Sequence, residues 1–286
     1  MSGTEMDVKQ FLARQRAAWD KGAEGWLKWR HVFAQRTDDQ ALVEASGAKP
    51  GDLVLDVGTG TGDPALALAQ AVGPEGRVVA TDLSEVMIDV ARRRADEAGL
   101  TNMEFRVSAA EDLDFVENSF DAVVSSFTLM LVADPGAAAR RIHALLRPGG
   151  RLALSVFATP DKVPMLAIPA QIIFSELGVQ PPPPGTPGLF ALGGPGQLQG
   201  VLEQAGFTEV SVSPLPFTFR YDSADEYGTF TREVTTVLTE LVEQHAPERQ
   251  DEIWAKATAF GRERAAADGS VTFENQALIG TGVRAS

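Results

Sequence analysis

The chain has 286 residues, of which 44% are hydrophobic and 22% are charged. This length allows one large domain or two small ones, and the composition excludes wholesale disorder. The absence of cysteine excludes disulfides, thiolate catalysis, cysteine-ligated zinc and iron–sulfur clusters. The net charge of −14 disfavours nucleic acid as a partner, because binding phosphates requires a basic surface.

Residues 5–45 are predicted to be helical, with Trp19, Trp26 and Trp29 interleaved with charged residues. The N-terminus carries early acids and no apolar stretch of signal-peptide length. No segment approaches the roughly 18 uncharged apolar residues of a membrane span. We therefore expect a cytoplasmic protein without a membrane span.

Short apolar runs then alternate with helical patterns. Strands are predicted at 53–57, 78–82, 103–107, 120–126 and 151–157, and helices at 64–72, after Ser84, and at 134–146. Ser84 and Asp134 are predicted helix N-caps, because their side chains can accept from unpaired backbone N–H groups. This alternation predicts βαβ units and a parallel sheet.

The alternation of predicted strands and helices stops at 158–195, where four prolines at 181–184 favour a stiff, extended connector. Two interpretations stay open for this segment, a surface loop and part of a lid. Beyond it we expect a helix at 198–205, a strand at 210–212, helices at 224–244 and 248–267, and a last strand near 271–279.

The richest motif is the run VLDVGTGTGD at 54–63, where a predicted strand meets a glycine turn and then a helix. Glycine lets backbone approach a ligand closely, and the helix N-terminus presents N–H groups. A dinucleotide loop would read G-x-G-x-x-G, whereas here the third glycine, Gly62, comes one residue early. Asp56 and Asp63 would repel a pyrophosphate, so a ligand with both ammonium and carboxylate groups suits the loop better.

Asp82 closes the second predicted strand. An acid at this place can bind both hydroxyls of a ribose. The alternative for Asp82 alone is a turn that precedes Ser84. In combination with the glycine loop, we interpret it as a ribose-binding residue.

At this point the chain resembles the class I S-adenosylmethionine-dependent methyltransferases, and in particular the ubiquinone/menaquinone-biosynthesis type. The resemblance rests on VLDVGTGTGD at 54–63, VVATDLSEVM at 78–87, SAAEDLDF at 108–115, SFDAVVSSFTLMLVADP at 119–135 and LLRPGGRLALSVF at 145–157. It covers 48–157 well and 195–213 weakly. The ordered set is far more specific than any one motif.

The resemblance implies S-adenosyl-L-methionine as cofactor and a set of positions that bind it. The methionine end would be held by Asp56, Gly58, Thr59, Gly60, Thr61 and Gly62, the ribose by Asp82, and the adenine by Leu83, Met87, Ala109, Ala110 and Glu111, with Ser126 closing the site. One departure is Ala109, where relatives often carry Asp or Asn. Its side chain cannot bond the adenine amine, so backbone groups, Glu111 or Asp112 must replace that contact.

The resemblance also implies an α/β fold, a Rossmann-like, doubly wound, seven-stranded and mostly parallel sheet with helical cap insertions and an antiparallel last strand. We expect an N-terminal helical lid at 1–45, a cofactor-binding core at 46–157, a proline-rich lid insertion at 158–195, core again at 196–214, a helical cap at 215–268 and the final core strand at 269–286.

The implied reaction is methyl transfer to a small molecule at O, C or N. Positioning supplies much of such catalysis, so no fixed triad is required. His31 is a weak candidate base; His143 and His245 favour structural roles, and the three histidines lack metal-ligand spacing, so no metal is expected.

The tryptophans either pack the N-terminal helices on the domain or form a wall for a sulfonium or an apolar acceptor. Further wall candidates are Phe127, Met130, Phe157, Met165, Phe174, Tyr221, Tyr227 and Phe230. Each of them alone is more typical of core, but together they favour an apolar or aromatic acceptor.

Three rival functions are kept. The first is a protein that binds the cofactor without methylating and catalyses a rearrangement or cyclisation of a secondary metabolite. The second, a nicotinamide oxidoreductase, is disfavoured by the glycine spacing. The third, a nucleic-acid or protein methyltransferase, is disfavoured by the charge. The acceptor, the methylated atom and the oligomeric state do not follow from the sequence.

Overall fold

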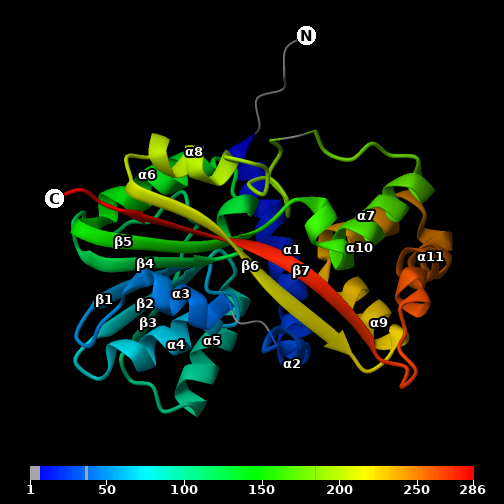
Figure 1. Cartoon of the computed structure of the whole chain (residues 1–286), viewed down its shortest axis with the longest axis horizontal. Helices are drawn as coiled ribbons and strands as arrows, with labels where there is room; N and C mark the ends of the chain where they lie inside the picture. The colour runs from blue at the N-terminus through cyan, green and yellow to red at the C-terminus, as the bar shows by residue number, and fades with distance from the viewer. Residues whose placement is uncertain (1–6, 36–37, 184) are drawn as a thin grey trace, which may run out of the picture.

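The computed structural model describes residues 7–35, 38–183 and 185–286. Seven strands form one sheet in the order β3-β2-β1-β4-β5-β7-β6, flanked by helices on both faces (Figure 1). The strands are β1 Leu53–Val57, β2 Arg77–Asp82, β3 Met103–Val107, β4 Phe120–Ser126, β5 Leu146–Phe157, β6 Thr208–Tyr221 and β7 Val271–Val283. The first five are mutually parallel, while β7 runs antiparallel to both β5 and β6. The predicted α/β class and the antiparallel last strand are confirmed.

Each face of the sheet has its own apolar core. Val54 of β1 packs with α3 Asp38–Ser46 and α4 Asp63–Val72, whereas its neighbour Leu55 belongs to the core beneath α6 Pro135–Leu145 and α8 Gln197–Gln204. Successive strand side chains point to opposite faces, so a strand buried on both sides is mostly apolar. This is why β1 reads as an apolar run in the sequence, with the buried Asp56 as its one polar residue.

Helix caps follow the predictions. Ser84 accepts from the Met87 N–H at 3.1 Å at the start of α5 Glu85–Glu97. Asp134 accepts from the Ala137 N–H at 2.9 Å at the start of α6. Short 3₁₀ turns at Leu129–Leu131, Pro160–Lys162 and Pro247–Arg249 join the larger elements.

A second body of helices sits at the distal end of β6 and β7, which run past β5 (Figure 1). It comprises α7 Pro164–Leu177, α9 Ala224–Val234, α10 Thr236–His245 and α11 Gln250–Glu263. Ile173, Leu238 and Trp254 belong to a separate apolar cluster between these helices. The N-terminal helix α1 Val8–Lys28, followed by α2 Arg30–Phe33, contacts α5, α9 and α10, and therefore bridges the sheet and this body.

Three predictions in this half of the chain need correction. Strand β6 extends far beyond 210–212, so residues 215–221 of the predicted cap belong to a strand. Pro214 and Pro216 obscured it, but β6 is the edge strand of the sheet, where proline is tolerated. The segment 158–195 contains α7, which begins with a proline at its first turn and carries Pro169 inside. The single helix expected at 224–244 is interrupted at Thr235, where the backbone leaves the helical conformation.

No helix among the described residues is long and apolar enough to cross a membrane.

Candidate functional site

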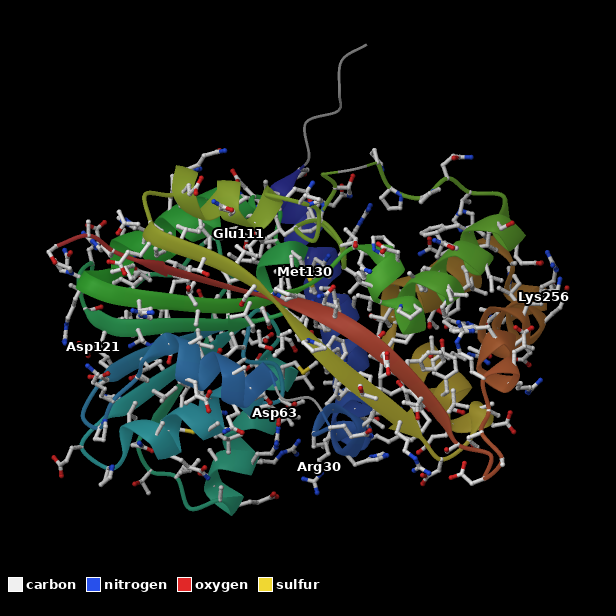
Figure 2. All side chains as sticks on the ribbon, in the orientation of Figure 1. Arg30, Asp63, Glu111, Asp121, Met130 and Lys256 are labelled. Carbon is white, nitrogen blue, oxygen red and sulfur yellow. The ribbon has the colours of Figure 1, made fainter. Side chains whose placement is uncertain are left out.

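The main pocket lies where the carboxyl ends of β1, β2 and β4 face helix α1. It holds about 1020 Å³ of empty space, its open mouth included. Eleven of the thirteen predicted cofactor residues line it: Gly58, Thr59, Gly60, Thr61, Asp82, Leu83, Met87, Ala109, Ala110, Glu111 and Ser126. Asp63 and Glu111 lie in the middle of the molecule, between the far end of the sheet at Asp121 and the distal helices at Lys256 (Figure 2).

The glycine loop turns because three of its residues adopt positive φ angles, +74° at Gly58, +54° at Gly60 and +97° at Gly62. A Cβ at Gly58 would overlap the Thr128 side chain, whose hydroxyl donates to the Gly58 carbonyl at 3.3 Å. At Gly60, in contrast, a Cβ would meet no protein atom within 4 Å. Gly60 therefore keeps open a space that a ligand can fill.

Asp82 ties this loop to the end of β2. Its Oδ2 accepts from the Gly60 N–H at 2.8 Å, and its Oδ1 accepts from the Ser84 N–H at 2.9 Å. The residue is only 9% exposed, and this burial raises the pKa of the carboxyl to about 6. A carboxylate at the pocket wall, held by two backbone donors, still has lone pairs available for hydroxyl groups of a ligand.

Asp56 lies fully buried beneath the loop and outside the pocket wall. Among the described residues, neither of its carboxylate oxygens has a hydrogen-bond partner, and neither has the Thr59 hydroxyl. Burial raises the pKa of Asp56 to about 7; the nearby Thr59 side chain offsets part of this rise without reaching hydrogen-bonding geometry. Unpaired buried polar groups of this kind are rare and call for a functional explanation.

Arg94, which the sequence interpretation missed, holds the far side of the loop. From α5 it donates to the Thr61 carbonyl at 2.6 Å and to Asp63 Oδ1 at 2.7 Å. The Thr61 hydroxyl donates to the other carboxylate oxygen at 3.0 Å. The ion pair between Arg94 and Asp63 is partly buried. Together with Thr61, these two side chains fix the shape of the loop. Only its place on α5, facing the glycine turn, could have suggested this role.

The segment after β3 forms the opposite wall of the pocket. The Ser108 hydroxyl donates to the Asp112 carbonyl at 2.7 Å within its own turn. Glu111 Oε1 accepts from the Ala133 N–H at 2.8 Å and so joins this segment to the loop after β4. Ala109 and Ala110 present no polar side chain to the pocket, as their identity dictates.

Aromatic side chains close the remaining side. Trp26 stacks on Phe33 with ring centroids 4.3 Å apart and planes 4° apart, and Trp19 meets Trp26 edge-on at 5.9 Å. All three line the pocket. Trp29 does not; its indole N–H donates to Glu233 at 2.6 Å. Trp19 and Trp26 thus line the pocket, whereas Trp29 packs between the helices; a wall for a sulfonium or an apolar acceptor stays a prediction.

Of the eight other aromatic and methionine wall candidates, only Phe127 lines this pocket. It directly follows β4 with a φ of +49° and lies against Phe157 at 4.4 Å. A bulky residue in the left-handed region is unusual and concentrates at functional sites. The other seven candidates pack elsewhere in the described structure.

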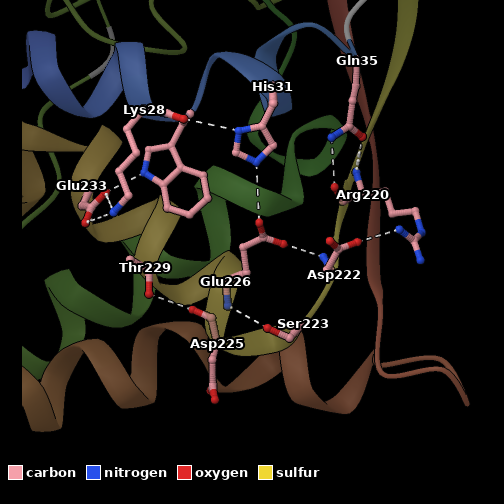
Figure 3. A network of polar contacts seen from close by, with 11 residues as sticks. Lys28, His31, Gln35, Arg220, Asp222, Ser223, Asp225, Glu226, Thr229 and Glu233 are labelled. Atoms are coloured by element: carbon pink, nitrogen blue, oxygen red, sulfur yellow. Dashed lines mark hydrogen bonds and ion pairs between the residues drawn. The ribbon is translucent and has the colours of Figure 1, made fainter.

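The histidines lie outside the pocket. His31 is mostly exposed, with Nδ1 3.3 Å from the Lys28 carbonyl and Nε2 3.6 Å from Glu226 (Figure 3). His143 packs edge-on against Phe207, and its pKa is lowered by burial and by Arg284. His245 contacts the Leu241 carbonyl at 3.0 Å. Among the described residues, no group of three or more side chains could hold a metal ion.

Of the segments expected to cover the acceptor, only 1–45 contributes to the pocket lining. Its residues there are Phe11, Leu12, Gln15, Trp19, Trp26 and Phe33. The described parts of 158–195 and 215–268 line no part of it. The three ionisable side chains at the pocket wall are Asp63, Asp82 and Glu111, and no described Lys, Arg or His joins them.

Comparison with known proteins agrees with this geometry. Residues 48–175 match the model of a methyltransferase domain family. The ubiquinone/menaquinone biosynthesis C-methyltransferase UbiE of Hydrogenovibrio crunogenus is 40% identical over 168 residues, which are 57% of this chain and 66% of the relative. The chain spans about half to two thirds of the length of the curated relatives that it matches.

Two solved structures show the same fold. Phosphoethanolamine N-methyltransferase 2 of Haemonchus contortus, in complex with S-adenosyl-L-methionine, is 19% identical with a TM-score of 0.61, covering 100% of this chain and 62% of that protein. The [4+2]-cyclase SpnF is 22% identical with a TM-score of 0.51, covering 86% of this chain and 79% of SpnF. With its motifs, sheet order and relatives in agreement, the chain carries a methyltransferase domain at 48–175 and is similar to the class I S-adenosylmethionine-dependent methyltransferases, in particular to their UbiE type.

Proposed function

We propose that this protein transfers a methyl group from S-adenosylmethionine to a small, apolar or aromatic molecule. One observation carries the proposal: a single pocket is lined both by a polar set of residues, the glycine loop and Asp82, and by an aromatic set, Trp19, Trp26 and Phe33. The polar set suits the cofactor and the aromatic set suits an acceptor without charge. Methyl transfer needs both ligands in one continuous space.

The residues present fit the cofactor. Gly60 leaves space where any side chain would intrude, and Asp82 offers a buried carboxylate at the pocket wall. We assign the loop from Gly58 to Gly62, with Asp56 beneath it, to the methionine end and Asp82 to the ribose. Leu83, Met87 and the wall at 109–111 are assigned to the adenine, and Ser126 to closure of the site. When bound, S-adenosylmethionine supplies an electrophilic sulfonium methyl group.

The aromatic set supports an uncharged acceptor. A phosphate or carboxylate acceptor would need a cationic partner, and the described pocket wall has none. The relatives are named for C-methylation in ubiquinone and menaquinone biosynthesis. We therefore propose a carbon atom of a hydroxylated aromatic ring as the first acceptor to test, with oxygen and nitrogen acceptors as alternatives.

Positioning of the two ligands and exclusion of water would supply much of the acceleration of methyl transfer. The rings of α1 and Phe127 hold an aromatic molecule between apolar surfaces, where the reacting atoms can be kept close. A base, if the acceptor needs one, must come from the carboxylates, because His31 lies outside the pocket. Asp63 is paired with Arg94, and one Glu111 oxygen accepts from Ala133.

We further propose that 1–45 acts as a lid over the 46–157 core, which 196–214 and 269–286 complete. The aromatic side chains that α1 and α2 contribute to the pocket support the lid role. For 215–268 we propose a supporting cap, whose helices α9 and α10 hold the far end of α1, and for 158–195 an insertion that packs on this cap through α7. The net charge of −14 supports a small molecule rather than nucleic acid as partner.

A second candidate function is retained because no described histidine or lysine lines the pocket. A protein with this site could bind the cofactor and use the rest of the pocket for a rearrangement or cyclisation. The name of SpnF as a [4+2]-cyclase shows that one protein of this fold carries such a function.

Calorimetric titration with S-adenosylmethionine, S-adenosylhomocysteine and NADH tests the proposal. We expect binding of the first two and none of the third. Incubation with S-adenosylmethionine and a panel of hydroxylated aromatic compounds should then yield S-adenosylhomocysteine and a methylated product. By mass spectrometry this product should be about 14 mass units heavier than the acceptor, because a methyl group replaces a hydrogen atom. Conversion of an acceptor without S-adenosylhomocysteine release would favour the second candidate, and NADH binding alone would refute both.

A further inference from the structure

Gln15 places an unused carboxamide at the pocket wall. It lies on the face of α1 that also carries Leu12 and Trp19, it is half-buried, and it lines the pocket. It makes no hydrogen bond with any residue that the structure describes. Other polar side chains at the pocket wall differ in this respect: Thr61, Ser108 and Glu111 all hydrogen-bond within the protein.

Two contacts fix where Gln15 lies. Arg16, the next residue, donates from Nε to the Leu83 carbonyl at 3.1 Å. One turn further, Asp20 accepts from the Ser84 hydroxyl at 2.5 Å. Both anchors therefore hold α1 on the segment that directly follows β2. Gln15 consequently belongs to the same end of the pocket as Leu83.

This end of the pocket is shaped for a flat ring with a polar edge. Its side chains Leu83, Met87, Ala109 and Ala110 are apolar, so they can cover the faces of such a ring but cannot bond its edge. A carboxamide offers a carbonyl acceptor and an NH₂ donor side by side. Adenine offers the complementary pair, an amine donor next to a ring-nitrogen acceptor, and glutamine pairs with it in two-point contacts elsewhere.

We propose that Gln15 of the N-terminal helix binds the polar edge of the adenine, its carbonyl accepting from the 6-amino group and its NH₂ donating to a ring nitrogen. This inference rests on the proposed function, since it takes the adenosine cofactor as the ligand. It makes α1 part of the cofactor site as well as a cover over the acceptor. It also supplies the side-chain contact that Ala109 cannot make.

Calorimetry on three proteins and two ligands tests the inference. The proteins are the wild type, Gln15→Met and, as a matched control, Gln10→Met, since Gln10 is exposed on the same helix and lines no part of the pocket. The ligands are S-adenosylhomocysteine and its purine analogue without the 6-amino group. Methionine keeps the length of the side chain and the helix propensity, so both variants should fold, and melting followed by circular dichroism verifies this.

We expect the wild type and Gln10→Met to bind S-adenosylhomocysteine roughly 10-fold more tightly than the analogue, and Gln15→Met to bind both ligands about equally. Wild-type affinity of Gln15→Met for S-adenosylhomocysteine would overturn the inference. So would weaker binding by Gln15→Met with the preference for the amino group retained, because that result assigns Gln15 to packing. Failure of the wild type to bind S-adenosylhomocysteine would overturn the proposed function, and this inference with it.

Discussion

Replacing Asp56 by asparagine should change how the stability of the ligand-free protein depends on pH. Asp56 is fully buried and both carboxylate oxygens lack a partner among the described residues. Burial, followed by repulsion from Asp39, Asp82 and Asp63, raises its pKa from 3.8 to about 7. The folded protein therefore retains a proton on this carboxyl that the unfolded chain has already lost.

The sign follows from proton binding in the two states. Between pH 5 and 7 the unfolded chain has Asp56 ionised while the folded protein has it protonated, so the free energy of unfolding falls as pH rises. Above pH 7 both states are ionised and this contribution is flat. Two pH units at about 1.36 kcal/mol each predict a loss of about 2.7 kcal/mol between pH 5 and pH 8.

Urea unfolding of the wild type and of Asp56→Asn at pH 5, 6, 7 and 8 measures this contribution. Groups that titrate equally in both proteins, including Asp82 with its pKa of about 6, cancel in the difference. Relative to the wild type, the free energy of unfolding of Asp56→Asn should rise by about 2.7 kcal/mol from pH 5 to pH 8. The exposed Asp96→Asn serves as control and should follow the wild type. Parallel curves for the wild type and Asp56→Asn would refute the reasoning.

Other variants probe the pocket. Asp82→Ala should weaken S-adenosylhomocysteine binding by about 1–3 kcal/mol in calorimetry, since it removes the proposed ribose acceptor and the Gly60 acceptor; unchanged affinity in a folded protein would contradict this. Gly60→Val should fold, with a strain of about 1–3 kcal/mol in thermal melts, yet lose cofactor binding; normal titration would rule out the loop assignment. Arg94→Ala should lower both cofactor affinity and urea stability, the latter by roughly 1–3 kcal/mol. His31→Ala should leave methyl transfer rates within about 2-fold, and a larger loss would restore His31 as the base.

Much of the core could be predicted from the sequence, because its strands, helix caps and glycine turn depend on residues that are close together in the chain. Apart from Asp56, the strand at 53–57 is apolar on both faces because both faces are buried, and Ser84 and Asp134 cap helices with their own side chains. The glycine loop is equally local, since its turn depends on backbone angles that glycine adopts readily. The other predicted cofactor positions came from the family resemblance that the ordered motifs carry, and eleven of the thirteen line one pocket.

The strand and helix boundaries of the second half were harder to predict. Pro214 and Pro216 are compatible with β6 only because it lies at the edge of the sheet, and the position of a strand within a sheet is a property of the whole fold. Helix α7 was hidden by its internal proline and by the proline run that follows it.

The sequence by itself thus determined the fold class, the glycine loop and the acid that ends β2, because each depends on residues close together in the chain. Only the tertiary structure decided which side chains complete the pocket. Gln15, Trp26 and Phe33 reach it because Arg16 and Asp20 bind residues 67 and 64 positions away. The same folding places His31 outside it, beside Glu226. Contacts across such separations arise from the packing of helix α1 between the sheet and the distal helices, and no local pattern encodes them.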